Sequence, residues 1–358
     1  MSVFFDLKAI GASDDVLEHF HVSATRGLTL GRVSAVNRDQ YRLYTEHGER
    51  TAEAIGALLY RAPDSAALPA VGDWVAAQLI DRETAMIHDV LPRRTKFSRR
   101  ASGNREVEQI VASNIDLILV VCGLDQDFNL RRVERYLTLS LESGAEAAVV
   151  LNKSDVCAEL GARLEETRRI SRGARVVAIS AISGQGISDV AELIGNQRTV
   201  ALLGSSGAGK STLVNQLLGE ERQQVQEVRE SDSRGRHTTT RRELIPLPGG
   251  GALIDTPGMR ELQLWATQES LDSTFTDIAE LSLSCRFRDC KHAGEKGCAV
   301  AEALADGSLE MARWESYCKL RAEIRWHERQ TDAGAARAEK QRWKAIHKEM
   351  RARYKNQW

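Results

Sequence analysis

The sequence lacks any apolar run long enough to cross a bilayer. The longest strongly apolar stretch, residues 115–122, is far shorter than the roughly 20 residues that a spanning helix needs. Residues 1–8 have no basic segment followed by an apolar core, so they do not indicate a signal peptide. We therefore expect a cytoplasmic protein with no membrane partner.

Cysteine is also scarce, and net charge is almost zero. Six cysteines in 358 residues are too few for a disulfide scaffold. A formal net charge of −1 gives no sign of nucleic acid, but the charge is unevenly distributed. Residues 93–100 hold five positive side chains, and residues 321–358 hold 11 Lys/Arg against 5 Asp/Glu. Together with Trp314, Trp326, Trp343 and Trp358, the basic C-terminal segment favours an RNA-binding surface, and the alternative is a solvated helix whose tryptophans pack inward.

The length suggests two or three domains, and we expect a multi-domain protein. Residues 1–25 resemble a polar tail. Within residues 26–100, five short segments have strand character: 31–36, 41–44, 56–60, 72–79 and 85–90. This pattern favours an OB-fold β-barrel that binds RNA, with a generic small barrel or an SH3-like domain as the alternative.

Residues 101–268 have a different pattern, in which apolar strands alternate with amphipathic helices. The expected strands are 115–122, 147–151, 175–179, 199–203 and 252–255, and the expected helices are 129–143, 157–171, 187–195 and 210–219. This alternation predicts an α/β domain with a mostly parallel sheet covered on both faces. Residues 220–250 are less regular, and residues 269–358 predict a mostly α-helical domain.

A glycine-rich loop follows the strand 199–203. Gly204, Ser205, Ser206, Gly207, Ala208, Gly209, Lys210 and Ser211 fit the phosphate-binding pattern GxxxxGK[ST], and Thr212 follows. The glycines allow backbone N–H groups to point at phosphate oxygens, and the next helix adds its positive N-terminal end. Lys210 is expected to reach the β- and γ-phosphates, and the Ser211 hydroxyl to bind Mg²⁺.

A guanine-reading motif lies earlier in the chain. Asn152, Lys153, Ser154 and Asp155 follow the strand 147–151, at the end of a parallel strand where ligands bind. The Asp155 carboxylate can accept two N–H bonds from guanine, which adenine cannot supply. Asn152 can tie this loop to the phosphate loop. In an ordinary GTPase the phosphate loop comes first, so the order here indicates a circularly permuted domain.

The segments expected to sense the γ-phosphate follow the phosphate loop. Asp255 would hold Mg²⁺ through water, the Gly258 N–H would meet the γ-phosphate, and Thr240, with Thr239 as the alternative, would complete the Mg²⁺ shell. Met259 stands where many GTPases carry a water-orienting glutamine. His237 is a candidate for positioning water, and a surface loop histidine is the alternative.

Three cysteines and a histidine lie within 14 residues: Cys285, Cys290, His292 and Cys298. Four such ligands suit one tetrahedral, structural Zn²⁺. Lys291 and Lys296 lie inside the cluster and are expected to lower the thiol pKa values.

The order of these motifs, with a barrel before and a Cys₃His cluster after, resembles the circularly permuted ribosome small subunit-dependent GTPase A family, also called RsgA or YjeQ. The resemblance covers residues 31–320 and implies that backbone N–H groups at Ser180 and Ala181 meet the guanine carbonyl. It also implies GTP hydrolysis to GDP during late maturation of the small ribosomal subunit, with rRNA contacts by the barrel and the zinc domain. Hydrolysis would be slow until the subunit stimulates it, and would release the factor.

Two other functions stay open at this point. A P-loop ATPase or kinase would not need Asp155, and a non-catalytic zinc and RNA-binding module would use the nucleotide only to stabilise its fold. A factor that works on a ribosome can act as a monomer.

Overall fold

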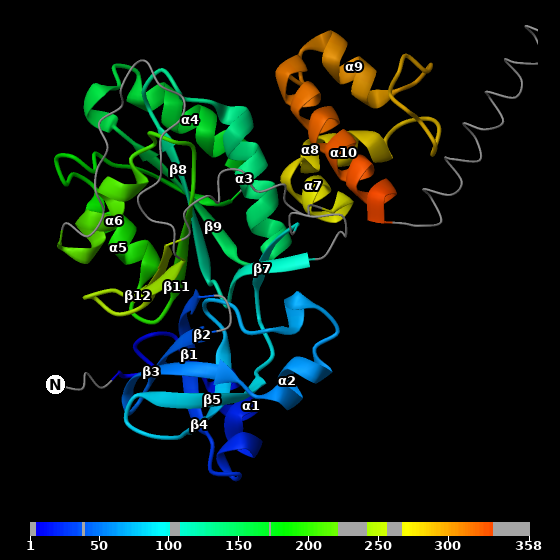
Figure 1. Ribbon diagram of the computed structural model, residues 1–358. Coiled ribbons are helices and arrows are strands. Elements are labelled where there is room, and N and C mark those ends of the chain that lie inside the picture. Colours follow the sequence, from blue (N-terminus) through cyan, green and yellow to red (C-terminus); the bar gives the residue numbers. More distant parts are fainter. Residues whose placement is uncertain are drawn as a thin grey trace, which may run out of the picture. The chain divides into compact units, whose positions relative to one another are not determined.

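A computed structural model describes residues 5–37, 40–100, 108–171, 173–220, 242–255 and 267–331 (Figure 1). The chain divides into two compact units, Met1–Leu264 and Trp265–Trp358. The first unit holds a small β-barrel and an α/β domain, and the described part of the second is helical. In the part of the chain that is described, no helix is long and apolar enough to cross a membrane.

The barrel is a closed ring of five strands, as the sequence predicts. Its strands are β1 (Thr29–Asn37), β2 (Gln40–Thr45), β3 (Gly48–Ala54), β4 (Trp74–Leu79) and β5 (Thr84–Val90). The ring runs β1-β2-β3-β5-β4 and closes through the β4–β1 pairing, with β3 and β5 parallel. The strand predicted at 56–60 is wrong: these residues form helix α2 (Gly56–Arg61), and the third strand lies before them.

The prediction of a polar tail at residues 1–25 is also wrong for residues 5–25, the part that the structure describes. Helix α1 (Asp14–Ala24) begins at the N-cap Ser13, whose side chain accepts a hydrogen bond from the N–H of Val16. Ile10 and Val16 are buried, and the N–H of Gly251 donates to the carbonyl of Ala9 (2.7 Å). This segment therefore packs as part of the first unit.

The α/β domain is a mostly parallel sheet with helices on both faces (Figure 1). Its strands are β8 (Leu117–Gly123), β9 (Glu146–Asn152), β10 (Arg175–Ala178), β11 (Thr199–Leu203), β12 (Glu243–Pro246) and β13 (Ala252–Asp255). Helices α3 (Leu130–Ser143) and α4 (Leu160–Ser171) cover one face, and α5 (Ile187–Ile194) and α6 (Lys210–Leu218) cover the other. The order β10-β9-β8-β11-β13 places the predicted motif loops at neighbouring strand ends.

Strand β12 is the antiparallel element of this sheet, and the sequence did not predict it. It pairs with β13 and also with barrel strand β1, where Ala35 lies opposite Glu243. The Tyr44 hydroxyl donates to the carbonyl of Leu244 (3.2 Å). The barrel and the α/β domain thus share one continuous sheet, which explains why they belong to one compact unit.

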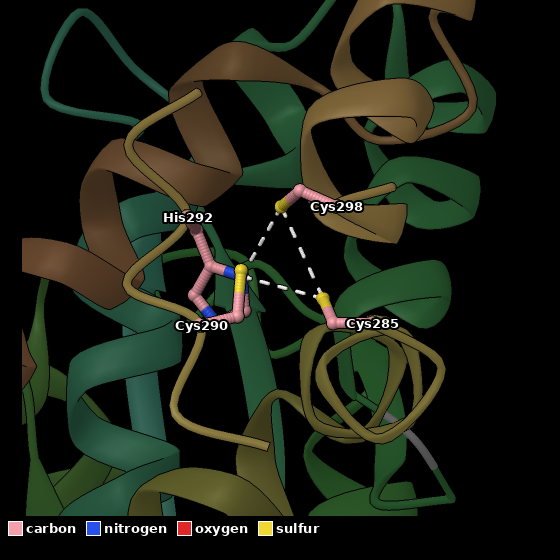
Figure 2. Close-up of side chains that lie close together, drawn as sticks. All are labelled: Cys285, Cys290, His292 and Cys298. Atoms are coloured by element: carbon pink, nitrogen blue, oxygen red, sulfur yellow. Dashed lines mark hydrogen bonds between the residues drawn. The ribbon is translucent and has the colours of Figure 1, made fainter. Parts of the chain in front are cut away.

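In residues 267–331, the described part of the second unit, four helices pack around an apolar core. They are α7 (Gln268–Thr274), α8 (Thr276–Leu283), α9 (Ala299–Asp306) and α10 (Met311–Thr331). Phe275 and Ile278 are fully buried in this core, and Arg313 forms an ion pair with Asp277 (2.7 Å). The four predicted metal ligands lie together in the loop between α8 and α9 and at its two ends (Figure 2).

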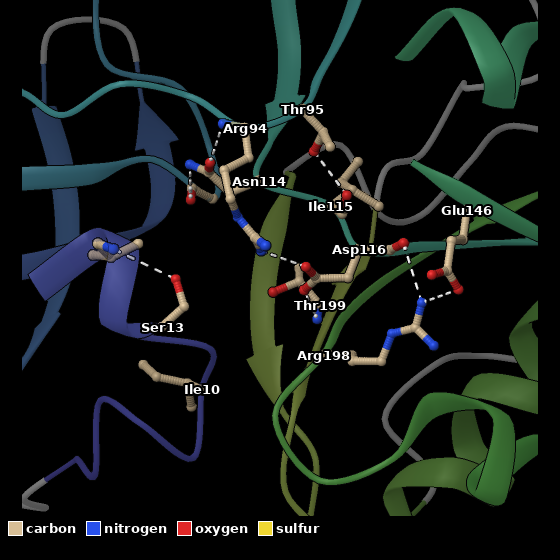
Figure 3. Close-up of polar contacts among 12 residues, drawn as sticks. Ile10, Ser13, Arg94, Thr95, Asn114, Ile115, Asp116, Glu146, Arg198 and Thr199 are labelled. Atoms are coloured by element: carbon tan, nitrogen blue, oxygen red, sulfur yellow. Dashed lines mark hydrogen bonds and ion pairs between the residues drawn. The ribbon is translucent and has the colours of Figure 1, made fainter. Parts of the chain in front are cut away.

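The basic run at residues 93–100 connects the barrel to the α/β domain, and its first three basic side chains are paired with carboxylates. Arg93 pairs with the buried Asp73 (2.7 Å) and Lys96 with Glu108 (2.9 Å). Arg94 pairs with Asp116, whose other oxygen accepts from the N–H of Thr199 (Figure 3). These three side chains therefore support the junction instead of forming a free basic patch. The run enters a two-stranded ribbon, β6 (Lys96–Arg100) with β7 (Glu108–Ser113).

One fully buried arginine joins the barrel, the N-terminal segment and the α/β domain. Arg32, on β1, donates to the carbonyl of Ile10, to the carbonyl of Asn114 (3.3 Å) and to the hydroxyl of Thr199 (2.7 Å). Its guanidinium also lies over the ring of Trp74 (4.8 Å to the centroid). Burial lowers the pKa of Arg32 to about 10, so the side chain stays charged at neutral pH.

Candidate functional site

Two loops that the sequence assigned to one nucleotide lie at the same edge of the sheet. Residues 152–155 follow β9, and residues 204–211 follow β11. Strand β8 lies between β9 and β11, and it is parallel to both, so both loops leave from the carboxyl edge of the sheet. A ligand that bridges these loops would occupy the usual position for parallel α/β sheets.

Asn152 connects the two loops directly. Its side-chain amide donates to the carbonyl of Ala208 in the phosphate loop (2.9 Å). Its side-chain oxygen accepts from the N–H of Ala181 (2.9 Å) and from the N–H of Lys153 (2.8 Å). Asn152 is only 2% exposed, so each of these groups would lose its partner in a dry environment if the side chain were removed. The side chain therefore joins three of the predicted binding segments.

The glycines of the phosphate loop are required by close backbone approaches. At Gly204 a Cβ atom would lie 2.2 Å from the carbonyl oxygen of Val121, and at Gly209 it would lie 2.1 Å from the side-chain nitrogen of Asn152. Gly209 also has φ +86°, a left-handed conformation that disfavours other residues. A side chain at Gly209 would thus displace the connection between the two loops.

Lys210 and Ser211 begin helix α6 at the end of this loop. The Lys210 ammonium donates to the carbonyls of Gly204 (2.8 Å) and Ser205 (2.5 Å), which holds it across the loop. Ser206 and Gly207 are exposed at the loop's tip. The loop combines a cation, a hydroxyl and the positive end of a helix, which are the groups that bind phosphate and its magnesium ion.

The guanine-reading motif is a turn held by backbone contacts, and its last residue is exposed. Lys153 has φ +67°, and the N–H of Ser154 donates to the carbonyl of Ile179 (3.0 Å). Asp155 lies in the short 3-10 turn that follows, with its side chain exposed. Ser180 and Ala181 are buried directly after β10. An exposed carboxylate beside a buried strand end is free to meet a base.

Two carboxylates that the sequence analysis missed lie in the loop between β8 and α3. Asp125 forms an ion pair with Lys153, and Asp127 accepts a hydrogen bond from the hydroxyl of Ser205 (2.7 Å). Asp127 also pairs with Arg132, and this contact is the main cause that lowers the pKa of Asp127 below its ordinary value. The turn-like sequence of this loop contained no motif that pointed to these contacts.

The structure describes only some of the residues that are expected to sense the γ-phosphate and bind Mg²⁺. Asp255 ends β13, opposite Glu243 on β12. Thr240, with its alternative Thr239, and His237, Gly258 and Met259 lie outside the described residues.

The metal cluster has the geometry of a tetrahedral zinc site. The ligand atoms of Cys285, Cys290, His292 and Cys298 all lie within 4.8 Å of one another (Figure 2). A zinc ion with Zn–S bonds of about 2.3 Å sets neighbouring sulfurs about 3.8 Å apart. The sulfurs of Cys285 and Cys298 are 3.9 Å apart, and the Nδ1 atom of His292 lies 3.4 Å from Cys298 and 3.6 Å from Cys285. The donor set and its spacing fit zinc, with no open coordination position.

Neighbouring side chains orient the imidazole of His292. The Ser282 hydroxyl donates to the carbonyl of Ile278 (2.7 Å), so its oxygen is left to accept from Nε2 of His292 (3.4 Å). This arrangement puts the proton on Nε2 and leaves the Nδ1 lone pair for a metal. Trp314 meets the imidazole edge-on (5.6 Å between centroids), and burial lowers the pKa of His292, which favours the neutral ring.

The thiol pKa values depend on burial and hydrogen bonds more than on the lysines that the sequence suggested. At Cys285, burial opposes the charged form, but N–H groups of Val300 and Ala299 and the neighbouring thiols lower the pKa overall. At Cys290, burial raises the pKa to about 11. Neither Lys291 nor Lys296 is among the main causes of these shifts. The first turn of α9 therefore supplies the charge-stabilising groups on one side of the site.

The fold and the connected loops define the class of protein: a circularly permuted P-loop GTPase fold with an N-terminal barrel and a helical Cys/His domain. The family model for RsgA GTPase matches residues 90–265. A relative from Opitutus terrae named "Small ribosomal subunit biogenesis GTPase RsgA" is 48% identical over 97% of each chain, and one of the same name from Syntrophotalea carbinolica is 43% identical over 95% of this chain and 96% of the relative.

Two solved structures share the fold. YjeQ from Thermotoga maritima superposes with a TM-score of 0.63 at 24% identity, covering 83% of this chain and 98% of that one. The structure of YloQ, a circularly permuted GTPase, gives a TM-score of 0.60 at 24% identity, covering 84% and 96%. The chain belongs to the RsgA GTPase family, and its enzymatic class is GTP hydrolysis.

Proposed function

We propose that this protein is a cytoplasmic GTPase that binds the small ribosomal subunit, assists its late maturation, and leaves after hydrolysing GTP. The observation that carries the nucleotide part is the position of Asn152, which holds the guanine-reading loop and the phosphate loop together. The ribosomal part is supported by relatives that are named small ribosomal subunit biogenesis GTPases and match nearly the whole chain.

In this proposal the guanine base lies against Asn152, Lys153, Ser154 and Asp155, with Ser180 and Ala181 beside its carbonyl. In the structure the Ala181 N–H donates to the side-chain oxygen of Asn152 (2.9 Å) and the Ser180 N–H to the carbonyl of Gln185 (3.0 Å), so a bond from either N–H to the base would have to share or replace these contacts. Residues 204–212 wrap the phosphates, and Lys210 neutralises their charge. Ser211, Asp255 and Thr240 would hold Mg²⁺, which neutralises charge on the phosphate oxygens when it is bound. The donors that these residues offer are oxygens, which this ion prefers.

Hydrolysis needs a water molecule in line with the γ-phosphate. Met259 cannot orient it, because its thioether is only a weak acceptor. We assign this role to His237, with the Gly258 N–H at the γ-phosphate. A His237→Ala variant is expected to keep GTP affinity and lose turnover, and unchanged turnover would exclude the role.

The RNA contact is assigned to the barrel and to the second unit. Around the Cys/His cluster four basic side chains are exposed: Arg286, Arg288, Lys291 and Lys296. None of the four forms an ion pair with a described residue, whereas the run at residues 93–96 is largely neutralised. Unpaired cations on a small rigid domain are suited to an RNA backbone. Zinc would keep this surface folded, and the protein would act as a monomer.

The test is GTP hydrolysis by the purified protein alone, with small subunits, and with large subunits. Stimulation by small subunits only supports the proposal, and equal rates in all three would contradict its ribosomal part. Nucleotide choice is tested with Asp155→Asn, which is expected to shift preference from GTP to xanthosine triphosphate. If ATP competes equally with GTP in the wild type, the protein is an ATPase or kinase instead, and no turnover under any condition would favour a non-catalytic module.

A further inference from the structure

The loop between β8 and α3 (residues 124–129) is placed by the fold between the two halves of the nucleotide site. Strand β8 pairs with β9 on one side, where Gly123 lies opposite Asn152. It pairs with β11 on the other side, where Val120 lies opposite Leu203. The chain that leaves β8 therefore emerges between the guanine-reading loop and the phosphate loop.

One carboxylate of this loop contacts the guanine-reading loop, and another contacts the phosphate loop. Asp125 forms an ion pair with the ammonium of Lys153, and the two side chains are 34% and 21% exposed. Asp127 accepts a hydrogen bond from the Ser205 hydroxyl (2.7 Å) on the other side. One residue separates the two aspartates along the chain, yet they contact opposite halves of the site.

The loop itself is well braced. The N–H of Leu124 donates to the carbonyl of Asn152 (2.8 Å), and the N–H of Asp127 donates to the carboxylate of Asp125 (3.1 Å). Asn129 caps α3 by accepting from the N–H groups of Arg131 (2.9 Å) and Arg132 (3.2 Å). A loop with these contacts holds its carboxylates in place instead of letting them follow the side chains they bind.

We propose that Asp125 and Asp127 are positioning residues with divided tasks: Asp125 places Lys153 for the guanosine moiety, and Asp127 places Ser205 for the phosphates. The inference rests on the proposed nucleotide function. The chemistry follows from the partners. A lysine held by one ion pair keeps its stem along the base face, and an anchored serine keeps the first turn of the phosphate loop in its binding conformation. Neither aspartate needs to touch the ligand.

The division of tasks gives a test with two ligands. Affinities for GDP and for guanosine are measured by displacement of fluorescent mant-GDP from the wild type, Asp125→Ala and Asp127→Ala. Asp125→Ala is expected to weaken the binding of both ligands by the same factor, about three- to fivefold for a partly exposed ion pair. Asp127→Ala is expected to weaken GDP binding by a similar factor. Its affinity for guanosine should stay within twofold of the wild-type value, because guanosine has no phosphate.

Two further variants control for charge and for folding. Glu159→Ala removes a carboxylate a few residues beyond the guanine-reading motif. Its ion pair among the described residues is with Arg163 (3.8 Å), so the variant is expected to leave both affinities unchanged. Asp125→Glu keeps the charge on a longer arm, which the flexible Lys153 can follow, so most of the affinity should return. A structural role alone predicts neither the rescue nor the split between ligands.

The inference is overturned if either alanine variant binds both ligands as the wild type does, or if Asp127→Ala weakens guanosine as much as GDP. It is also overturned if Asp125→Glu is no better than Asp125→Ala while thermal unfolding shows both folded. Wild-type protein that does not bind mant-GDP would overturn the proposed function, and this inference with it.

Discussion

Removing the side chain of Asn152 tests the central claim that two loops distant in sequence form one site. The Asn152→Ala variant loses three hydrogen bonds in a position that is 2% exposed. A typical hydrogen bond contributes about 1 kcal/mol net, so the free energy of unfolding should fall by about 3 kcal/mol. If half of that energy also organises the loops for binding, GDP affinity should fall by about tenfold, since about 1.4 kcal/mol is a factor of ten.

A matched control is available in the same unit. Asn114 is also buried, with its amide donating to the carbonyl of Gly72 (3.1 Å) and its oxygen accepting from the N–H of Arg94 (3.0 Å). It lies at the junction with the barrel, away from both motif loops. Asn114→Ala should therefore lower stability by a comparable amount and leave GDP affinity within about twofold.

The measurements are urea unfolding followed by tryptophan fluorescence, and mant-GDP titration under conditions where all variants are folded. The reasoning is refuted if Asn152→Ala destabilises by less than about 1 kcal/mol, because three buried hydrogen bonds cannot be worth so little. It is refuted equally if the two variants lose the same affinity, since the effect would then report general destabilisation.

Three other changes have defined outcomes. Gly209→Ala should weaken GDP binding more than tenfold, because its Cβ would meet the Asn152 amide at 2.1 Å, and wild-type affinity in a titration would contradict the geometry. Ser282→Ala should weaken zinc by about 10- to 100-fold in a chelator competition, whereas Ser284→Ala, which loses only a bond to a helical carbonyl, should not. Arg32→Met should lower the free energy of unfolding by about 3 kcal/mol, measured in urea, because it leaves buried acceptors unpaired; a loss below 1 kcal/mol would exclude that role.

The two nucleotide motifs and the metal cluster could be predicted because each is contiguous. Their chemistry depends on residues close in sequence, such as Gly204 to Ser211, and on a strand or loop beside them. The sheet order then brings the motifs together without further information, because parallel strands place their carboxyl ends at one edge. The structure confirms the zinc-like geometry and the covered parallel sheet on these grounds.

The barrel shows where local pattern fails. Residues 56–60 have the apolar character of a strand, yet they form α2, in which Leu59 and Tyr60 are exposed. Strand β3 alternates buried and exposed residues, but its buried positions are Gly48, Arg50 and Ala52, which carry little hydrophobic signal. Residues 48–54 form a strand because they pair with β2 and β5 in the closed ring. These pairings are tertiary contacts, which the local sequence does not show.

The charged run at residues 93–100 carries less unpaired charge than its composition suggests, for a related reason. Its acidic partners Asp73, Glu108 and Asp116 come from other segments, so the local composition shows only the positive half of each pair. A basic stretch is evidence for RNA only where its partners are absent, and that is a property of the folded chain. The exposed cations around the Cys/His cluster meet this condition among the described residues, and Arg93, Arg94 and Lys96 at the junction do not.

The loop between β8 and α3 also lacks a local signal, and its contacts come from segments that are distant in sequence. Asp125 and Asp127 belong to no motif, and their sequence neighbours resemble any polar turn. Their importance follows from one topological fact: β8 lies between the strand that leads to Asn152 and the strand that leads to Gly204. Circular permutation makes β8 the first strand of the domain instead of an internal one, but it leaves this neighbourhood intact, because sheet order is fixed by packing and hydrogen bonds rather than by where the chain begins. Residues that hold two motifs together must therefore be sought on the strand between them, wherever that strand occurs in the sequence.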